Sequence, residues 1–385
     1  MIDTPQALDI LVERTLTAGC VAIDTEFVWE RTYYPQLGVV QLGFSEEDTV
    51  LIDAAAFQDL RPLGRLLASP DVVKVLHDAG QDLTILRRVT GASPKNIFDS
   101  RLAGGFVGLS ATLSLGDLLR ELLGVSLSKT EARSNWLRRP LSEAQRAYAH
   151  ADVRYLPAAR DALLAQARHR HREAWLQEEM ATYDDPALYE EPDPFQQYVR
   201  VSGAGRLTAR QRAALRELTA WREEEARRRD LPRGRVVSDK ALVDAARRLP
   251  ESRADLAALR DLDDRVRQRH GAAFLDAVQR GLDTRLEDCP PAPERPPNDE
   301  AFTARVHFLL AYLTGKSLAE GIAPTLVATR AEVTHLVATD PDVSPDEHAL
   351  LRGWRRTFMG DDLLGLLGGQ RAIRLDPETG LARLG

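Results

Sequence analysis

The sequence predicts one α/β domain with a mixed sheet, followed by two small helical domains. The chain has 385 residues, more than one ordinary hydrophobic core holds. Short β-branched runs alternate with helical patterns up to about residue 180, and only helical patterns follow. Two proline-rich stretches separate these parts. We therefore expect domains at residues 1–182, 206–284 and 300–385, joined by linkers at 183–205 and 285–299.

Four β-branched runs in the first part predict strands. They are VAIDTEF at 21–27, LGVVQLGF at 37–44, VLID at 50–53 and VVKVLHD at 72–78. Turn-like segments separate the first three runs, and a helical pattern follows the fourth. Consecutive strands followed by strand–helix alternation indicate a mixed sheet with flanking helices.

Helical patterns complete the first domain at residues 81–89, 114–125 and 141–156. Ser114 and Ser142 precede two of these patterns and are expected to be N-caps. Pro157 is expected to end or kink the third helix. In the second domain, Thr208 and Gln211 have the spacing of a capping box, which predicts a helix start there.

The composition restricts the function classes. The net charge of −7 shows no excess of positive charge, so nucleic-acid binding would need local basic patches or metal ions. Cys20 and Cys289 are far apart in sequence, which argues against a disulfide framework or a zinc site and favours the reducing cytoplasm. We expect no signal peptide and no membrane span. We expect a monomer, because the helical patterns form no long apolar seam.

Four carboxylates on separate elements are candidates for metal ligation. Asp24 and Glu26 lie two residues apart on a predicted strand, so they share a face and repel unless a cation or proton intervenes. Asp82 stands near a helix start, and Asp152 follows Tyr148 by four residues, on one helical face. Taken singly, each has an ordinary explanation as a strand-end, helix-start or surface residue. Together they would suit Mg²⁺, and two such ions about 4 Å apart can promote phosphodiester hydrolysis.

These motifs, in their order along the chain, carry a resemblance to a known family. VAIDTEF, YYPQLGVVQLG, HDAGQDLTIL and YAHADVRYL together resemble the tyrosine subgroup of the DEDD exonucleases, and within it the ribonuclease D family. The block beginning LTAWREEEARRRDLPRGRVV resembles the helicase-and-ribonuclease-D C-terminal (HRDC) domain, and the last block resembles a second, diverged HRDC domain. The resemblance implies a ribonuclease-H-like exonuclease domain followed by two small all-α HRDC-type domains.

The resemblance also implies a chemistry for the carboxylates. Asp24, Glu26, Asp82 and Asp152 match the ligands of two divalent metal ions, Mg²⁺ or Mn²⁺, and Tyr148 matches the tyrosine that positions the attacking water. Asp24 would bridge both ions, and at least one carboxylate should have a raised pKa before metal binds. The implied activity is 3′→5′ trimming of RNA, with release of nucleoside 5′-monophosphates and with transfer-RNA precursors as substrates. The alternatives are a 3′→5′ DNA exonuclease and a non-catalytic RNA-binding adaptor.

Six further residues are candidate RNA contacts: Phe27, His77, Lys129, Trp136, Arg233 and Arg235. Phe27 directly follows Glu26 and could stack on terminal bases. His77 could help to orient the site. The others belong to two basic segments, SKTEARSNWLRRP and ARRRDLPRGRVV, which could bind phosphates. Structural roles are open for all six: a core phenylalanine, a structural histidine, a solvated loop around a buried tryptophan, and arginines that balance nearby glutamates.

Overall fold

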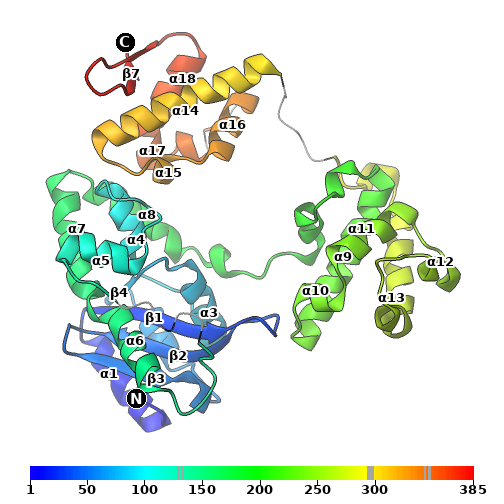
Figure 1. Ribbon diagram of the computed structural model, residues 1–385, viewed down its shortest axis with the longest axis horizontal. Coiled ribbons are helices and arrows are strands. Elements are labelled where there is room, and N and C mark those ends of the chain that lie inside the picture. Colours follow the sequence, from blue (N-terminus) through cyan, green and yellow to red (C-terminus); the bar gives the residue numbers. More distant parts are fainter. Residues whose placement is uncertain (128–130, 132–133, 293–298, 342–343, 346–347) are drawn as a thin grey trace. The chain divides into compact units, whose positions relative to one another are not determined.

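The computed structural model describes residues 1–127, 131, 134–292, 299–341, 344–345 and 348–385 (Figure 1). These residues form two compact units, and neither is continuous in sequence. The first unit comprises Met1–Glu26, Leu37–Tyr189 and Arg295–Gly385, and the second comprises Phe27–Gln36 and Glu190–Glu294. This division differs from the three consecutive domains that the sequence suggested.

A mixed sheet forms the centre of the first unit. Its strands are β1 (Cys20–Val28), β2 (Gln36–Gly43), β3 (Thr49–Asp53), β4 (Val73–Leu76) and β5 (Ile97–Asp99). Their order is β3-β2-β1-β4-β5. The β2–β3 pair is antiparallel, whereas β1–β4 and β4–β5 are parallel. The four predicted strands and the mixed sheet are confirmed. The fifth strand has only three residues, too few to show an alternating pattern.

Helices flank this sheet, as Figure 1 shows. They are α1 (Pro5–Leu16), α2 (Leu63–Leu67), α3 (Gly80–Thr90), α4 (Ser100–Phe106), α5 (Leu115–Leu123), α6 (Glu143–Arg154), α7 (Leu156–His169) and α8 (Glu173–Ala181). The predicted caps are confirmed, since Ser114 caps α5 and Ser142 forms a capping box with Gln145 on α6. Pro157 lies in the first turn of α7, where its missing N–H breaks no helical hydrogen bond.

The C-terminal block belongs to the same unit as the sheet. Its elements are α14 (Glu300–Glu320), α15 (Pro324–Val327), α16 (Arg330–Thr339), α17 (Gly353–Arg355), α18 (Asp361–Leu367), β6 (Ile373–Leu375) and β7 (Ala382–Leu384). The N–H of Ala323 donates to the carbonyl of Gly105 at 2.9 Å, and the guanidinium of Arg172 donates to the carbonyl of Gly321 at 2.7 Å. Trp354 packs edge-on against Phe106, with ring centroids 5.0 Å apart.

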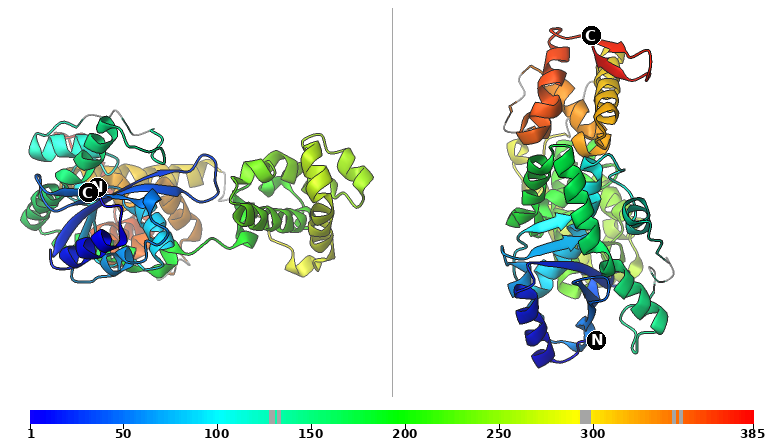
Figure 2. Two further views of the ribbon diagram at one scale, coloured as in Figure 1. Left: turned by 90° about the horizontal axis from the view of Figure 1, so that it is seen from below. Right: turned by 90° about the vertical axis from the view of Figure 1, so that its left-hand side faces the viewer.

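One hydrophobic core therefore runs through the α/β fold and the C-terminal helices. In the right-hand view of Figure 2 the orange and red helices lie beside the green α7 and α8 region, in agreement with these contacts. The predicted separate domain at 300–385 is thus part of the first compact unit. The expectation of an all-α block was also incomplete, because a short antiparallel hairpin, β6–β7, closes the chain.

Apart from the segment Phe27–Gln36, the regular elements of the second unit are helices, as predicted. It contains α9 (Ala209–Arg229), α10 (Arg233–Val236), α11 (Asp239–Arg248), α12 (Arg253–Ala257) and α13 (Asp264–Asp283). Thr208 and Gln211 form the predicted capping box on α9. Leu215 and Leu218 of α9 are fully buried in one core with Phe274 of α13. None of the described helices has both the length and the apolar composition needed to cross a membrane.

The predicted linker at 183–205 is anchored at both ends. Within the first unit, the hydroxyl of Tyr183 donates to the carboxylate of Asp99 at 2.7 Å. In the second unit, Val201 and Ala204 are buried in the helical core. This proline-rich segment forms only short 3₁₀ helices. Its aliphatic side chains nevertheless pack into the core of the second unit.

Candidate active site

Three of the predicted carboxylates meet at one place in the first unit. Asp24 and Glu26 stand near the end of β1, and Asp152 comes from α6. One carboxylate oxygen from each lies within 4.8 Å of the others. Strand alternation places the first two on one face, as predicted, and the packing of α6 on the sheet supplies the third.

Asp82 joins the same cluster from another element. It lies in the first turn of α3 and is buried. Its carboxylate accepts a hydrogen bond from the hydroxyl of Thr25, the residue between Asp24 and Glu26. Its charge also raises the pKa values of both Asp24 and Glu26, which places the four carboxylates in one electrostatic site.

Close backbone packing positions α6 against the sheet. A Cβ atom at Gly43 on β2 would overlap the carbonyl oxygen of Val153, the neighbour of Asp152. Glycine is therefore required there if α6 is to lie this near the sheet. The hydroxyl of Thr49 on β3 adds a hydrogen bond of 2.7 Å to Nδ1 of His150.

The cluster has an uncompensated negative charge. Burial, followed by the charges of Asp82, Asp152 and Glu26, raises the pKa of Asp24 well above its ordinary value. Burial and two neighbouring carboxylates raise the pKa of Glu26 to about 9. Burial raises the pKa of Asp152 to about 7 and that of Asp82 to about 6, against the opposing effect of their hydroxyl partners.

In the described part of the chain, no lysine or arginine forms an ion pair with any of these four carboxylates. The predicted repulsion, with its raised pKa values, is confirmed. A set of oxygen donors without cationic partners fits hard divalent cations.

Tyr148 lies one helical turn before Asp152 and directs its hydroxyl to that carboxylate. Burial and the nearby carboxylates raise the pKa of Tyr148 above its ordinary value. The phenol therefore keeps its proton at neutral pH and remains a hydrogen-bond donor. Its ring centroid lies 6.1 Å from that of Trp136.

Trp136 was a candidate RNA contact, with a buried position as the alternative, and the structure leaves it 1% exposed. A Cβ atom at Gly38 on β2 would overlap its carbonyl oxygen, so its backbone is pressed against the sheet. Arg139 extends this packing through ion pairing with Asp53. The indole thus supports the Tyr148 ring from the core instead of offering a free face to bases. Lys129 lies outside the described residues.

His77 was a candidate for orienting the site, with a structural role as the alternative. Its Nδ1 lies 3.0 Å from the hydroxyl of Ser100, and its Nε2 lies 3.1 Å from the carbonyl of Leu113. Burial lowers the pKa of His77, in favour of the neutral ring. Both ring nitrogens have protein partners, so this histidine ties β4 to the following elements.

The remaining candidate contacts have different surroundings. Phe27 is half-buried on β1, directly after Glu26. Arg233 pairs with the buried Glu223, at 2.5 Å from its Nε, so this arginine is engaged in a structural contact. Arg235 is exposed at the end of α10.

Two supporting residues escaped the sequence analysis. Nε2 of Gln41 donates to Oδ2 of Asp24 at 3.3 Å, and Thr25 holds Asp82. Gln41 is fully buried in the apolar strand β2. A polar side chain within such an apolar run needs a partner, and this was the available signal.

Comparison with known proteins identifies related nucleases. A 3′-5′ exonuclease family model matches residues 1–167, and an HRDC domain model matches residues 211–278. Ribonuclease D of Desulfotalea psychrophila is 37% identical over 94% of this chain and 96% of its own. Ribonuclease D of Acidiphilium cryptum is 35% identical over 97% of this chain and 94% of its own.

A solved structure is similar over almost the whole length. The crystal structure of Escherichia coli RNase D, described as an exoribonuclease involved in structured RNA processing, superposes with a TM-score of 0.86. It is 30% identical, and the match covers 96% of this chain and 98% of that one. The similarity thus extends over nearly the whole of both chains, and the chain belongs to the ribonuclease D family.

Proposed function

We propose that this ribonuclease D family member is a 3′→5′ exoribonuclease that hydrolyses RNA with two divalent metal ions, Mg²⁺ or Mn²⁺. Its products are nucleoside 5′-monophosphates, and its substrates are transfer-RNA precursors with single-stranded 3′ ends. The observation that carries this proposal is the meeting of Asp24, Glu26 and Asp152 within 4.8 Å, beside Asp82 and Tyr148.

The four carboxylates are assigned to metal binding. They are buried or half-buried, and each offers carboxylate oxygens as ligand atoms. They have no cationic partner among the described residues. Bound divalent ions would supply Lewis-acid stabilisation of the attacking and leaving oxygens of the phosphodiester. The proposal places all four side chains as ligands, with Thr25 and Gln41 orienting Asp82 and Asp24.

Tyr148 is assigned to the attacking water. Its raised pKa keeps the phenol protonated, so the hydroxyl can donate one hydrogen bond and accept another. Its contact with Asp152 holds it beside the carboxylates, and the buried Trp136 limits the motion of its ring. In this position the hydroxyl would hold a water molecule in line for attack on the terminal phosphodiester.

We further propose that the protein acts as a monomer in the cytoplasm. Its two cysteines, Cys20 and Cys289, are both free, which suits a reducing compartment.

The test uses a 3′-labelled transfer-RNA precursor with an unpaired tail, incubated with Mg²⁺ or Mn²⁺ beside single-stranded DNA of equal length. We expect stepwise release of labelled mononucleotide from RNA, abolished by chelation. Asp152→Asn should lower the rate by on the order of 10³-fold, whereas Asp161→Asn, an exposed control on α7, should leave it unchanged. Faster release from DNA would favour the DNA exonuclease, and binding without any release would favour the adaptor.

A further inference from the structure

The segment Phe27–Gln36, which joins β1 to β2, belongs to the HRDC-containing unit. The backbone N–H groups of Tyr33 and Tyr34 both donate to Oδ1 of Asp230, each at 3.0 Å. Asp230 is the C-cap of α9 and has a left-handed backbone with φ of 48°. One HRDC side chain therefore fixes two consecutive peptide groups of this segment.

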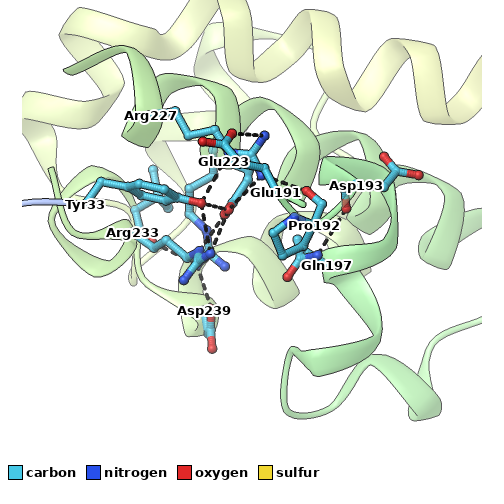
Figure 3. Close-up of polar contacts among 11 residues, drawn as sticks. Tyr33, Glu191, Pro192, Asp193, Gln197, Glu223, Arg227, Arg233 and Asp239 are labelled. Carbon is cyan, nitrogen blue, oxygen red and sulfur yellow. Dashed lines mark hydrogen bonds and ion pairs between the residues drawn. The ribbon is translucent and has the colours of Figure 1, made fainter. Parts of the chain in front are cut away.

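A buried charge cluster fixes the same segment through the Tyr33 side chain (Figure 3). The Tyr33 hydroxyl donates to Glu223, whose side chain is 1% exposed. Arg233 donates to the same hydroxyl at 3.1 Å, and its guanidinium lies 4.9 Å from the Tyr33 ring centroid. Arg227 donates to this hydroxyl from α9 at 3.2 Å. The segment is thus held by both backbone and side-chain contacts.

The anchored segment carries an exposed tryptophan. Trp29 has 63% of its surface exposed, whereas the other four tryptophans, all described, are buried or half-buried. An exposed indole does not contribute the stabilising free energy that burial of its large apolar surface would give. A single exposed aromatic side chain is common on protein surfaces, so only its position can indicate a binding role.

Trp29 is close in sequence to two residues of the acidic cluster, Asp24 and Glu26. Trp29 lies three residues after Glu26 and directly after Val28, the last residue of β1. Three residues span at most about 10 Å, however the chain bends. The indole is therefore within reach of nucleotides close to the one whose phosphodiester meets the carboxylates.

We propose that Trp29 stacks on a base of the single-stranded RNA 3′ end, and that Asp230 and Glu223 of the HRDC domain hold its segment in place. This inference rests on the proposed exoribonuclease function and adds a substrate contact to it. Aromatic side chains bind single strands by stacking with little sequence preference, because every base has a π-face. Such a contact selects an unpaired end, since a paired base is already stacked within its duplex.

The first test measures binding of a fluorescein-labelled 12-nucleotide oligo(A) RNA in EDTA, so that no cleavage occurs. Trp29→Ala should weaken binding about tenfold, and Trp29→Phe should restore most of it because the phenyl ring still stacks. Tryptophan fluorescence should fall when RNA is added to the wild type, and this change should be absent in Trp29→Phe. Unchanged thermal melting of both variants is expected, since the side chain is exposed.

The second test releases the segment without touching Trp29. Asp230→Gly tolerates the left-handed backbone but lacks the acceptor, whereas Asp230→Asn keeps both the conformation and an oxygen acceptor. The glycine variant should bind the oligo(A) several-fold more weakly and be cut faster by trypsin after the exposed Arg31, and the asparagine variant should behave like wild type.

The outcomes distinguish a failure of the proposed function from a failure of the stacking inference. If the wild type neither degrades nor binds RNA, the proposed function fails. If the wild type degrades RNA, but Trp29→Ala binds and cleaves single-stranded tails equally well, the stacking inference alone is overturned. If Trp29→Ala weakens binding but Asp230→Gly does not, the role given to the HRDC anchor is overturned.

Discussion

The two units each contain buried carboxylate charge, and they compensate it in opposite ways. In the first unit, the carboxylates of Asp24, Glu26, Asp82 and Asp152 gather without cationic partners in the described chain, and their pKa values are raised. In the second unit, burial alone would raise the pKa of Glu223. Hydrogen bonds from Arg233 and Tyr33, with the charge of Arg227, outweigh this effect and lower it.

The first site requires a ligand to balance its charge, whereas the charge of the second site is balanced by protein side chains. Glu223 has its counter-charges built in, so it stabilises the contact between the helical domain and its bound segment. The acidic cluster has hydroxyl and amide partners but no cationic partner among the described residues, so its charge must be neutralised by protons or by metal ions. The charge partners therefore distinguish the two sites better than the number of acids does.

The largest expected effect concerns the acidic site and its tyrosine. Tyr148→Phe removes the hydroxyl that meets Asp152 and should lower kcat about 10²-fold, with RNA affinity unchanged. Single-turnover RNA cleavage and binding in EDTA measure the two quantities. Tyr155→Phe, on the junction of α6 and α7, is the control and should leave both unchanged. A parallel loss of affinity in Tyr148→Phe would contradict the water-positioning role.

The second prediction breaks the compensated cluster. Glu223→Gln removes the charge that Arg233 and Arg227 share and should destabilise the protein by about 2 kcal/mol at neutral pH. Because the folded pKa of Glu223 is lowered, its contribution is present above the unfolded value near 4.5 and is lost as the pH falls through the folded value. Chemical denaturation of Glu223→Gln and of the exposed control Glu224→Gln at pH 7 and pH 3 measures this. Equal stability of both variants at pH 7 would count against it.

The third prediction concerns stability without metal ions. Raised folded pKa values mean that the acidic cluster favours the folded state at low pH, and that this stability is lost as the pH rises from about 4 to about 9. Asp24→Asn removes one repelling charge and should stabilise the metal-free protein by about 1 kcal/mol, or ~3 °C in Tm, at pH 8. Mg²⁺ should raise the Tm of the wild type more than that of the variant. Identical metal-free melting curves across this range would refute the claim.

The smallest expected effect tests the arginines of α10. Arg235→Glu should weaken RNA binding a few-fold and lower the salt dependence of binding by about one unit of slope, since the side chain is exposed. Arg233→Glu should instead lower thermal stability, because it places a second acid beside Glu223. Titrations of RNA at several salt concentrations, paired with melting curves, distinguish the two. Full RNA affinity in Arg235→Glu would exclude it from the RNA site.

Local chemistry made much of the fold predictable. The helix caps at Ser114, Ser142 and Thr208 depend on a side chain and a backbone only three residues away, so sequence was sufficient for them. The pair formed by Asp24 and Glu26 was equally accessible, because strand alternation alone places both on one face. Long-range partners were not accessible in this way. The sequence left two roles open for Trp136 and for Arg233, and packing decided that Trp136 is buried beside Tyr148 and that Arg233 pairs with Glu223.

By itself, the sequence determined the strands and helices, the acidic residues and their repulsion, because these depend on short-range geometry and on charge. Tertiary structure decided which charges are neutralised, that the C-terminal helices share a core with the sheet, and that the segment Phe27–Gln36 is held by the helical domain. These outcomes depend on contacts between residues 200 or more positions apart, such as Tyr33 with Arg233 and Phe106 with Trp354. Such contacts form only when whole elements pack, since burial and counter-charge are properties of the folded surroundings and not of a single stretch of chain.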